Sequence, residues 1–162
     1  MKELTVERLR EVLDYCPDTG VFTWKIRTNS RVKVGDVAGC LDKDGYLRIQ
    51  IDSRLHFTHR LAWFYVTGEW PPDQIDHING IRDDNRIANL RAATRSENGQ
   101  NRRKPQANNT TGYLGVTRHR GKFLAKIRLD GKRKHLGLFN TPEEAHAAYL
   151  KVKREIHPFG TI

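Results

Sequence analysis

A short stretch between residues 75 and 98 gathers side chains suited to acid–base and metal chemistry. Asp76 and His77 are neighbours. Amide side chains follow them at Asn79, Asn85, Asn89 and Asn98. Hard divalent cations prefer oxygen ligands, and Mg²⁺ is usually held by only one or two protein groups while substrate phosphate completes its coordination. The carboxylate of Asp76 and the amide oxygen of Asn98 would be a sufficient pair for such a cation.

His77 is the candidate general base in this stretch. Imidazole titrates near physiological pH, so a neutral ring held in the correct tautomer could take a proton from an attacking water. Asn89 could orient that ring by a hydrogen bond. The alternative for Asp76 and His77 is an exposed hairpin that carries the pair by chance, and single amides such as Asn79 are expected in turns and caps.

The elements that must position these residues follow from local patterns. A strand is predicted over residues 74–78, a turn-rich loop follows, and a second strand is predicted over residues 87–94. The sequence TRSE then fits a capping box that would start a helix, and this helix must end before Pro105. A hairpin folded against the helix could bring Asn98 back to Asp76.

The preceding residues predict a helix and several strands. Apolar residues recur at helical spacing over residues 3–15, and the turn sequence PDTG ends that helix. Alternating patterns predict strands over residues 20–26 and 45–51. Residues 59–67 predict a helix, or a transition from strand to helix, that Gly68 ends. The aromatic residues of that segment are expected in the core, with stacking on a nucleic-acid base as the alternative.

The charge balance indicates a polyanion as partner. The 162 residues include 29 Lys and Arg against 19 Asp and Glu, which gives a formal net charge of +10. The excess is concentrated between residues 102 and 134, where eleven basic residues accompany one acid, Asp130. A solvated basic face without function is the alternative, because charge runs often serve solubility. We favour nucleic acid.

Other classes of protein are disfavoured. No apolar run approaches the roughly 18 residues of a membrane span, and the first residues lack the apolar region of a signal peptide. We therefore expect a soluble, cytoplasmic protein that binds no membrane. Cys16 and Cys40 lack the spacing of a zinc site, so they are expected to be free thiols in a reducing compartment.

The C-terminal third predicts a separate unit that follows a polar linker at residues 105–111. Alternating segments between residues 112 and 139 predict three strands, and Thr141 followed by Pro142 predicts the start of a helix. In the middle strand, apolar residues would face the helix while Lys126 and Arg128 face the other way. Such a ribbon can enter the DNA major groove, where basic side chains meet phosphates or guanine edges.

The sequence DHINGIRDDNRIANLRAATRSEN resembles the HNH nuclease motif of phage- and intron-encoded homing endonucleases. The shared features are the Asp-His pair, the Gly, the Asn-Leu-Arg and the final Asn at the family's separations, and the resemblance covers residues 56–103. It implies a ββα-metal finger in which Asp76 and Asn98 bind one catalytic Mg²⁺ or Mn²⁺, His77 is the general base and Asn89 positions His77.

One part of the motif departs from the family. Asp84 stands before Asn85 where the family usually has a second Asn, so residues 83–85 are expected to form a turn. His59 lies in a segment, HRLA, that recurs upstream of the motif in similar proteins. We expect its role to be structural.

Residues 112–158 resemble the AP2 domain of plant ethylene-response factors, which also occurs fused to HNH nucleases. The likeness lies in the segments GYLGV, GKFLAKIR and LGLFNTPEEAHAAY. Other residues replace the family's Arg, Arg, Glu and Trp at Leu114, Thr117, Lys126 and His135, so the family's DNA target cannot be inherited. The residues expected to contact DNA are Arg102, Arg103, Arg118, Lys122, Lys126, Arg128, Lys132, Arg133 and Lys134.

Together these patterns predict an α+β protein with a β-rich N-terminal region. Residues 1–55 would form a helix and β-hairpin region, residues 56–104 the HNH nuclease module, and residues 112–162 an AP2-like three-stranded antiparallel sheet packed on one helix. The predicted activity is metal-dependent hydrolysis of phosphodiester bonds in double-stranded DNA, by a chain that could act as a monomer. The alternative is a non-catalytic DNA-binding protein, such as a transcriptional regulator, that uses the HNH fold as a scaffold.

Overall fold

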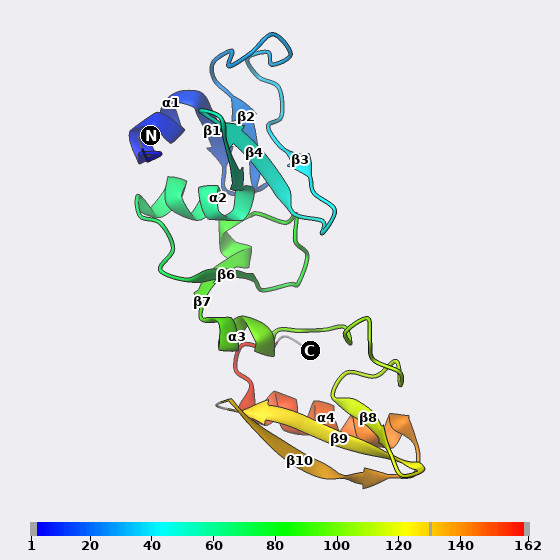
Figure 1. Cartoon of the computed structure of the whole chain (residues 1–162). Coiled ribbons are helices and arrows are strands. Elements are labelled where there is room, and N and C mark those ends of the chain that lie inside the picture. The colour runs from blue at the N-terminus through cyan, green and yellow to red at the C-terminus, as the bar shows by residue number, and fades with distance from the viewer. Residues whose placement is uncertain (1–2, 130, 161–162) are drawn as a thin grey trace. The chain divides into compact units, whose positions relative to one another are not determined.

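The computed structural model describes residues 3–129 and 131–160. The chain divides into two compact units, residues 1–93 and 94–162 (Figure 1). This division lies upstream of the linker expected at residues 105–111. Hydrogen bonds account for the difference: Lys153 Nζ donates to the carbonyl of Arg102 over 2.6 Å, which ties the segment before the expected linker to the C-terminal helix.

The first unit combines short helices with small antiparallel sheets. Its strands pair as β1-β2, β3-β4-β5 and β6-β7. Along the chain the elements are α1 (Val6–Val12), β1 (Leu13–Cys16), β2 (Val21–Trp24), β3 (Cys40–Leu41), β4 (Leu47–Ile51), β5 (Arg54–Phe57), α2 (Thr58–Thr67), β6 (Gln74–His77), the 3₁₀ turn η1 (Ile87–Asn89) and β7 (Leu90–Ala93).

The helix predicted over residues 3–15 is wrong at its C-terminal end, where residues 13–15 belong to β1. Leu13 and Tyr15 are buried and pair with Trp24 and Phe22 of β2. In a paired strand every second side chain faces the core, and this pairing overrides the helical spacing of the apolar residues. The transition from strand to helix is confirmed farther on, because β5 ends at Phe57 and α2 runs to a left-handed C-cap glycine at residue 68.

The core of the first unit anchors the β6–β7 hairpin. Leu61 and Phe64 of α2 are buried in the same cluster as Ile75 of β6 and Leu90 of β7. The other aromatic residues of α2 pack partly buried against that cluster, which supports their expected place in the core. The hairpin is therefore anchored by packing against the hydrophobic core of the first unit.

The second unit contains a short helix, a three-stranded sheet and a long helix. The sheet is antiparallel in the order β10-β9-β8, and α4 packs against β9 and β10 (Figure 1). The elements are α3 (Arg95–Gln100), β8 (Val116–His119), β9 (Lys122–Leu129), β10 (Lys132–Phe139) and α4 (Pro142–Ile156). The capping box predicted at Thr94 before α3 is present, and the N-cap predicted at Thr141 before α4 also forms a capping box, with Glu144.

A lysine is buried beside the apolar residues of α4. Ala145 and Tyr149 are buried, and Lys153 is only 1% exposed. Its ammonium group reaches the carbonyl of Arg102, which supplies the partner that a buried cation requires. Burial, followed by the charges of Arg103 and Arg102, lowers the pKa of Lys153 to about 8. Among the described residues, no helix is long and apolar enough to cross a membrane.

Candidate functional site

Asp76 and His77 lie side by side on β6 and are both buried. Their exposed fractions are 4% and 5%. In the antiparallel register Asp76 pairs with Arg91 and His77 with Leu90. The exposed-hairpin alternative is therefore wrong, because a hairpin at the surface would leave one of two successive side chains in solvent.

Arg91 fixes the carboxylate of Asp76. Its Nε and Nη2 atoms donate to Asp76 Oδ2 over 2.8 and 2.6 Å. Hydrogen bonds between two charged groups are short and strong, and the planar guanidinium sets the direction of the carboxylate. Arg91 was not among the site residues expected from the sequence, although the register of the predicted hairpin places it opposite Asp76.

Asn85 contacts the imidazole of His77. Its side-chain oxygen lies 3.2 Å from His77 Nε2, and its Nδ2 donates to the carbonyl of Asp83 over 3.2 Å. The second bond identifies the amide nitrogen, so the atom that faces His77 is an acceptor. This contact is a hydrogen bond in the tautomer that carries the proton on Nε2, which has its lone pair on Nδ1. Burial lowers the pKa of His77, while the bond to Asn85 and the charge of Asp76 act in the opposite direction.

Residues far from Asn85 in the sequence hold it in place. Asn85 is fully buried, and Tyr15 donates its phenolic hydrogen to the Asn85 carbonyl over 2.8 Å. Gly20, in the turn between β1 and β2, has a φ of +73°. A Cβ at Gly20 would lie 2.5 Å from the Asn85 carbonyl carbon, so the loop can approach this turn only because the residue is glycine.

Asn89 stabilises the loop instead of making the contact that we expected. Its Oδ1 accepts from the backbone nitrogen of Asn79 over 2.9 Å. Its Nδ2 donates to Asn79 Oδ1 over 3.0 Å and to the Asp84 carbonyl over 2.8 Å. None of these bonds reaches the His77 ring, whose amide partner is Asn85. A direct positioning role for Asn89 therefore has no support from its bonds.

Asp84 also serves the loop, in line with the turn expected there. It accepts two hydrogen bonds from the Arg86 side chain, over 2.8 and 2.6 Å, and one from Asn79 Nδ2 over 2.6 Å. The bonds from Arg86 contribute most to lowering the pKa of Asp84, to about 2. The carboxylate therefore stays charged and keeps the loop after β6 closed.

His59 packs directly on His77. The two rings meet edge to face with centroids 5.1 Å apart, and His59 also stacks on Phe57. Burial, followed by the charges of His77 and Arg60, lowers the pKa of His59 to about 3. Its Nδ1 is buried and has no hydrogen-bond partner among the described residues. His59 is thus a neutral packing neighbour of the candidate base, which agrees with the structural role expected for it.

The donor atoms suit a hard divalent cation. Asp76 offers a buried carboxylate, and Asn98, on α3, offers an amide oxygen. Within residues 3–129 and 131–160, no three His, Cys, Asp or Glu side chains gather so that they could hold a metal ion. A cation at Asp76 would therefore need amide oxygens or oxygens of a bound ligand. Because Asn98 belongs to the second unit, its pairing with Asp76 stays a prediction.

The residues expected to contact DNA all lie in the second unit. All of them are exposed except Lys126, which is half-buried. On β9 the expected alternation is present: Ala125 and Ile127 are buried against α4, while Arg128 is exposed. The predicted contacts with DNA remain untested. Cys16 and Cys40 are free and exposed.

The segment that carries Asp76 and His77 matches a known protein family. Residues 56–100 match the HNH endonuclease family. The matched HNH segment begins in β5 and ends in α3, so it contains the β6–β7 hairpin with Asp76, His77 and the loop that holds Asn85. No curated protein and no solved structure matches the chain significantly. The AP2-like interpretation of residues 112–162 therefore stays a prediction.

Proposed function

We propose that the chain is a divalent-metal-dependent endonuclease that hydrolyses phosphodiester bonds in DNA. The match of residues 56–100 to HNH endonucleases supports the reaction class. The observation that carries the proposal is the buried pair of His77 and Asn85, in which Asn85 accepts from Nε2 and leaves the lone pair of the imidazole on Nδ1. A protein that only binds DNA has no need of an imidazole held in one tautomer.

In this mechanism His77 acts as the general base. Its Nδ1 takes a proton from a water molecule whose oxygen attacks the phosphorus atom. The bond from phosphorus to the leaving oxygen breaks, and the leaving oxygen takes a proton from solvent. Asn85 keeps the ring in its reactive tautomer, and His59 limits the ring's rotation by edge-to-face packing.

Asp76 and Asn98 are the proposed protein ligands of the metal. When bound, Mg²⁺ or Mn²⁺ would neutralise charge that develops on the phosphate and on the leaving oxygen. The two hydrogen bonds from Arg91 to Asp76 Oδ2 keep the carboxylate oriented before the cation arrives. Asn98 is proposed from its position in the motif and its amide chemistry.

The second unit is proposed to hold DNA. Its basic side chains on β9 and β10 and in the segment after α3 can neutralise backbone phosphates. The resemblance to AP2 domains assigns such contacts to Arg128 and Arg133 in particular. Double-stranded DNA is the proposed partner of the whole chain.

Cleavage of supercoiled plasmid tests the proposed activity. We expect the full chain to cut the plasmid with Mg²⁺ or Mn²⁺ and not with EDTA. Asp76→Ala and Asn98→Ala should each lower the rate and raise the metal concentration needed for half-maximal activity, because each removes a proposed ligand. Asp73→Ala, which removes an exposed carboxylate just before the same strand, is the matched control and should behave as wild type. Cleavage that persists in EDTA would contradict the metal mechanism.

A further inference from the structure

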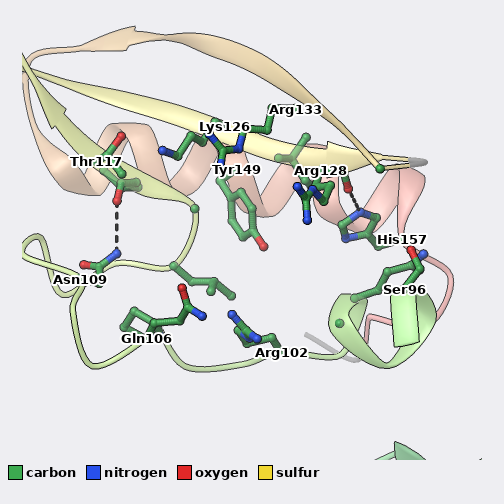
Figure 2. A pocket seen from close by; sticks show the side chains of 18 of the residues that line it. Ser96, Arg102, Gln106, Asn109, Thr117, Lys126, Arg128, Arg133, Tyr149 and His157 are labelled. Carbon is green, nitrogen blue, oxygen red and sulfur yellow. Dashed lines mark hydrogen bonds between the residues drawn. The ribbon is translucent and has the colours of Figure 1, made fainter. Parts of the chain in front are cut away.

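The second unit contains a cavity that the proposed cleavage chemistry does not use. Its volume is about 940 Å³, and it is open to solvent. One wall consists of residues of α3 and of the segment that follows it up to Asn109. The other consists of residues 114–117, residues 126–128 on β9, and Gly131 and Arg133 from the β9–β10 hairpin. Figure 2 shows Lys126, Arg128 and Arg133 along the strands and Arg102 and Gln106 on the opposite side.

The cavity is strongly cationic. Among the described residues of its lining there is no carboxylate. Five basic residues line it: Arg95, Arg102, Lys126, Arg128 and Arg133. Within the described part of the chain, none of these five side chains forms a salt bridge with an acid. Five neighbouring cations repel one another at close range, so an anion that enters the cavity gains from all of them.

The end of α4 joins the two walls. Lys153 Nζ donates to the carbonyl of Arg102 in the first wall over 2.6 Å, and His157 Nε2 donates to the carbonyl of Arg128 in the second wall over 2.7 Å. Both side chains are buried. The cavity is therefore a built feature of the fold, and its arginines are carried on backbone that is fixed before a ligand binds.

The shape and charge together indicate a ligand. The volume is in the range of about 300–1,000 Å³ that is typical of sites that enclose a ligand. Arginine suits phosphate, which it can bind through two parallel hydrogen bonds. Grooves that bind one nucleic-acid strand combine this kind of charge with aromatic side chains on which bases stack, and Tyr149 lines this cavity.

We propose that this cavity binds the backbone phosphates of a single nucleic-acid strand. The inference rests on the proposed function, because it makes the strand a part of the DNA substrate. It differs from the expected docking of the sheet in a major groove, since Arg95 and Arg102 lie outside the AP2-like segment and share the ligand with β9 and β10. The second unit would then hold one separated strand or a frayed end.

Paired charge-neutralising variants test the proposal. Arg95→Gln with Arg102→Gln removes two cations of the cavity, and Lys151→Gln with Arg154→Gln removes two exposed cations of α4 that do not line it. Affinity for a short fluorescent single-stranded oligonucleotide is measured by anisotropy over a KCl series, on the full chain and without divalent metal. Circular dichroism confirms that each protein is folded, and Lys126→Gln on the other wall replaces the cavity variant if that variant is unfolded.

We expect the cavity variant to bind at least about tenfold more weakly, and its log–log salt slope to flatten by about 0.7 for each phosphate that is no longer neutralised. The α4 variant should stay within about threefold of wild type. Equal losses in both variants would overturn the proposal, as would equally tight binding of inorganic phosphate and the oligonucleotide, which would identify a site for small anions.

The same measurement separates this inference from the proposed function. If the wild-type chain cuts plasmid with Mg²⁺ or Mn²⁺ but binds no oligonucleotide, only the proposed single-strand site fails. If it binds the oligonucleotide through the cavity but cleaves no DNA with Mg²⁺ or Mn²⁺, only the proposed nuclease activity fails.

Discussion

Replacing Asn85 by alanine removes the acceptor that holds the His77 ring. In the wild-type chain the side-chain oxygen of Asn85 lies 3.2 Å from His77 Nε2, and Asn85 is fully buried, so water cannot readily take its place. The alanine variant leaves a buried N–H without its partner. The ring then loses the interaction that favours the proton on Nε2 and the lone pair on Nδ1.

The expected magnitude follows from the cost of such a group. A buried donor without an acceptor costs about 1–3 kcal/mol, which corresponds to about 5- to 150-fold in rate if the loss falls on the reactive tautomer. The loss should appear in kcat and not in KM, because Asn85 is buried beneath the ring and contacts no DNA in the proposed mechanism. Asn85→Asp keeps an acceptor for Nε2 and should recover most of the lost rate.

Two measurements check this prediction. Plasmid cleavage gives kcat and KM, and ¹⁵N spectra of histidine-labelled protein report which nitrogen of His77 carries the proton. The chain has seven histidines, so the His77 signals are assigned by comparison with His77→Gln. We expect separate Nδ1 and Nε2 shifts in the wild type and converging shifts in Asn85→Ala. A folded Asn85→Ala protein with wild-type kcat and unchanged nitrogen signals would refute the reasoning.

Substitutions at Gly20, His59 and Lys153 give three further predictions. Gly20→Ala should lower the unfolding free energy by about 1–3 kcal/mol and lower kcat, because a Cβ there meets the Asn85 backbone. Gly45→Ala, at a residue with a φ of +83° and open space around it, should lower stability without changing kcat. Urea unfolding and cleavage rates compare the two variants. His59→Phe should keep kcat within about threefold of wild type and His59→Ala should cost about 2–4 kcal/mol in thermal unfolding, since packing is the role of this ring. Lys153→Met should remove a pH dependence of the unfolding free energy. The pKa of Lys153 is about 8 in the folded chain against 10.5 in the unfolded chain, so the unfolded chain binds the proton more tightly. In urea unfolding, wild-type stability relative to the variant should therefore rise by about 1–2 kcal/mol between pH 8 and 10.5.

Local signals predicted much of the fold around the candidate site. The capping box at Thr94 depends on residues three apart and the N-cap at Thr141 on the Pro142 that follows it, and both helix starts are present. The hairpin of β6 and β7 follows from alternation and turn residues within one segment. The neighbours Asp76 and His77 could therefore be placed on one strand from the sequence, because every pairing that defines the two strands lies within about twenty residues of chain.

Contacts between distant segments could not be predicted in this way. Asn85 is held by Tyr15, which precedes it by 70 residues, and it can approach the turn at Gly20 only because that residue lacks a Cβ. The sequence shows Asn85 as one of several amides in a turn, and we assigned the contact with His77 to Asn89. Nothing in the local pattern distinguishes the two amides, since the choice depends on which one the first hairpin presses against the ring.

Two further differences arise from pairings that apolar periodicity does not show. Residues 13–16 form β1 because they pair with β2, only 5 to 11 residues farther along the chain, although their apolar spacing also fits a helix. Lys153 is buried because a carbonyl 51 residues away accepts its ammonium group, whereas its polarity alone would place it in solvent. The partner of Lys153 lies outside the window in which periodicity is read.

The most direct test of the account compares DNA cleavage by the wild-type chain and by His77→Ala. Single-turnover cleavage is measured with Mg²⁺ or Mn²⁺, and DNA affinity is measured for both proteins without metal. The account predicts metal-dependent cleavage by the wild type and a loss of about 10²- to 10⁴-fold in His77→Ala, with Kd changed by less than about threefold. Cleavage by folded His77→Ala at the wild-type rate, or no cleavage of DNA by the wild type with either metal, would contradict it.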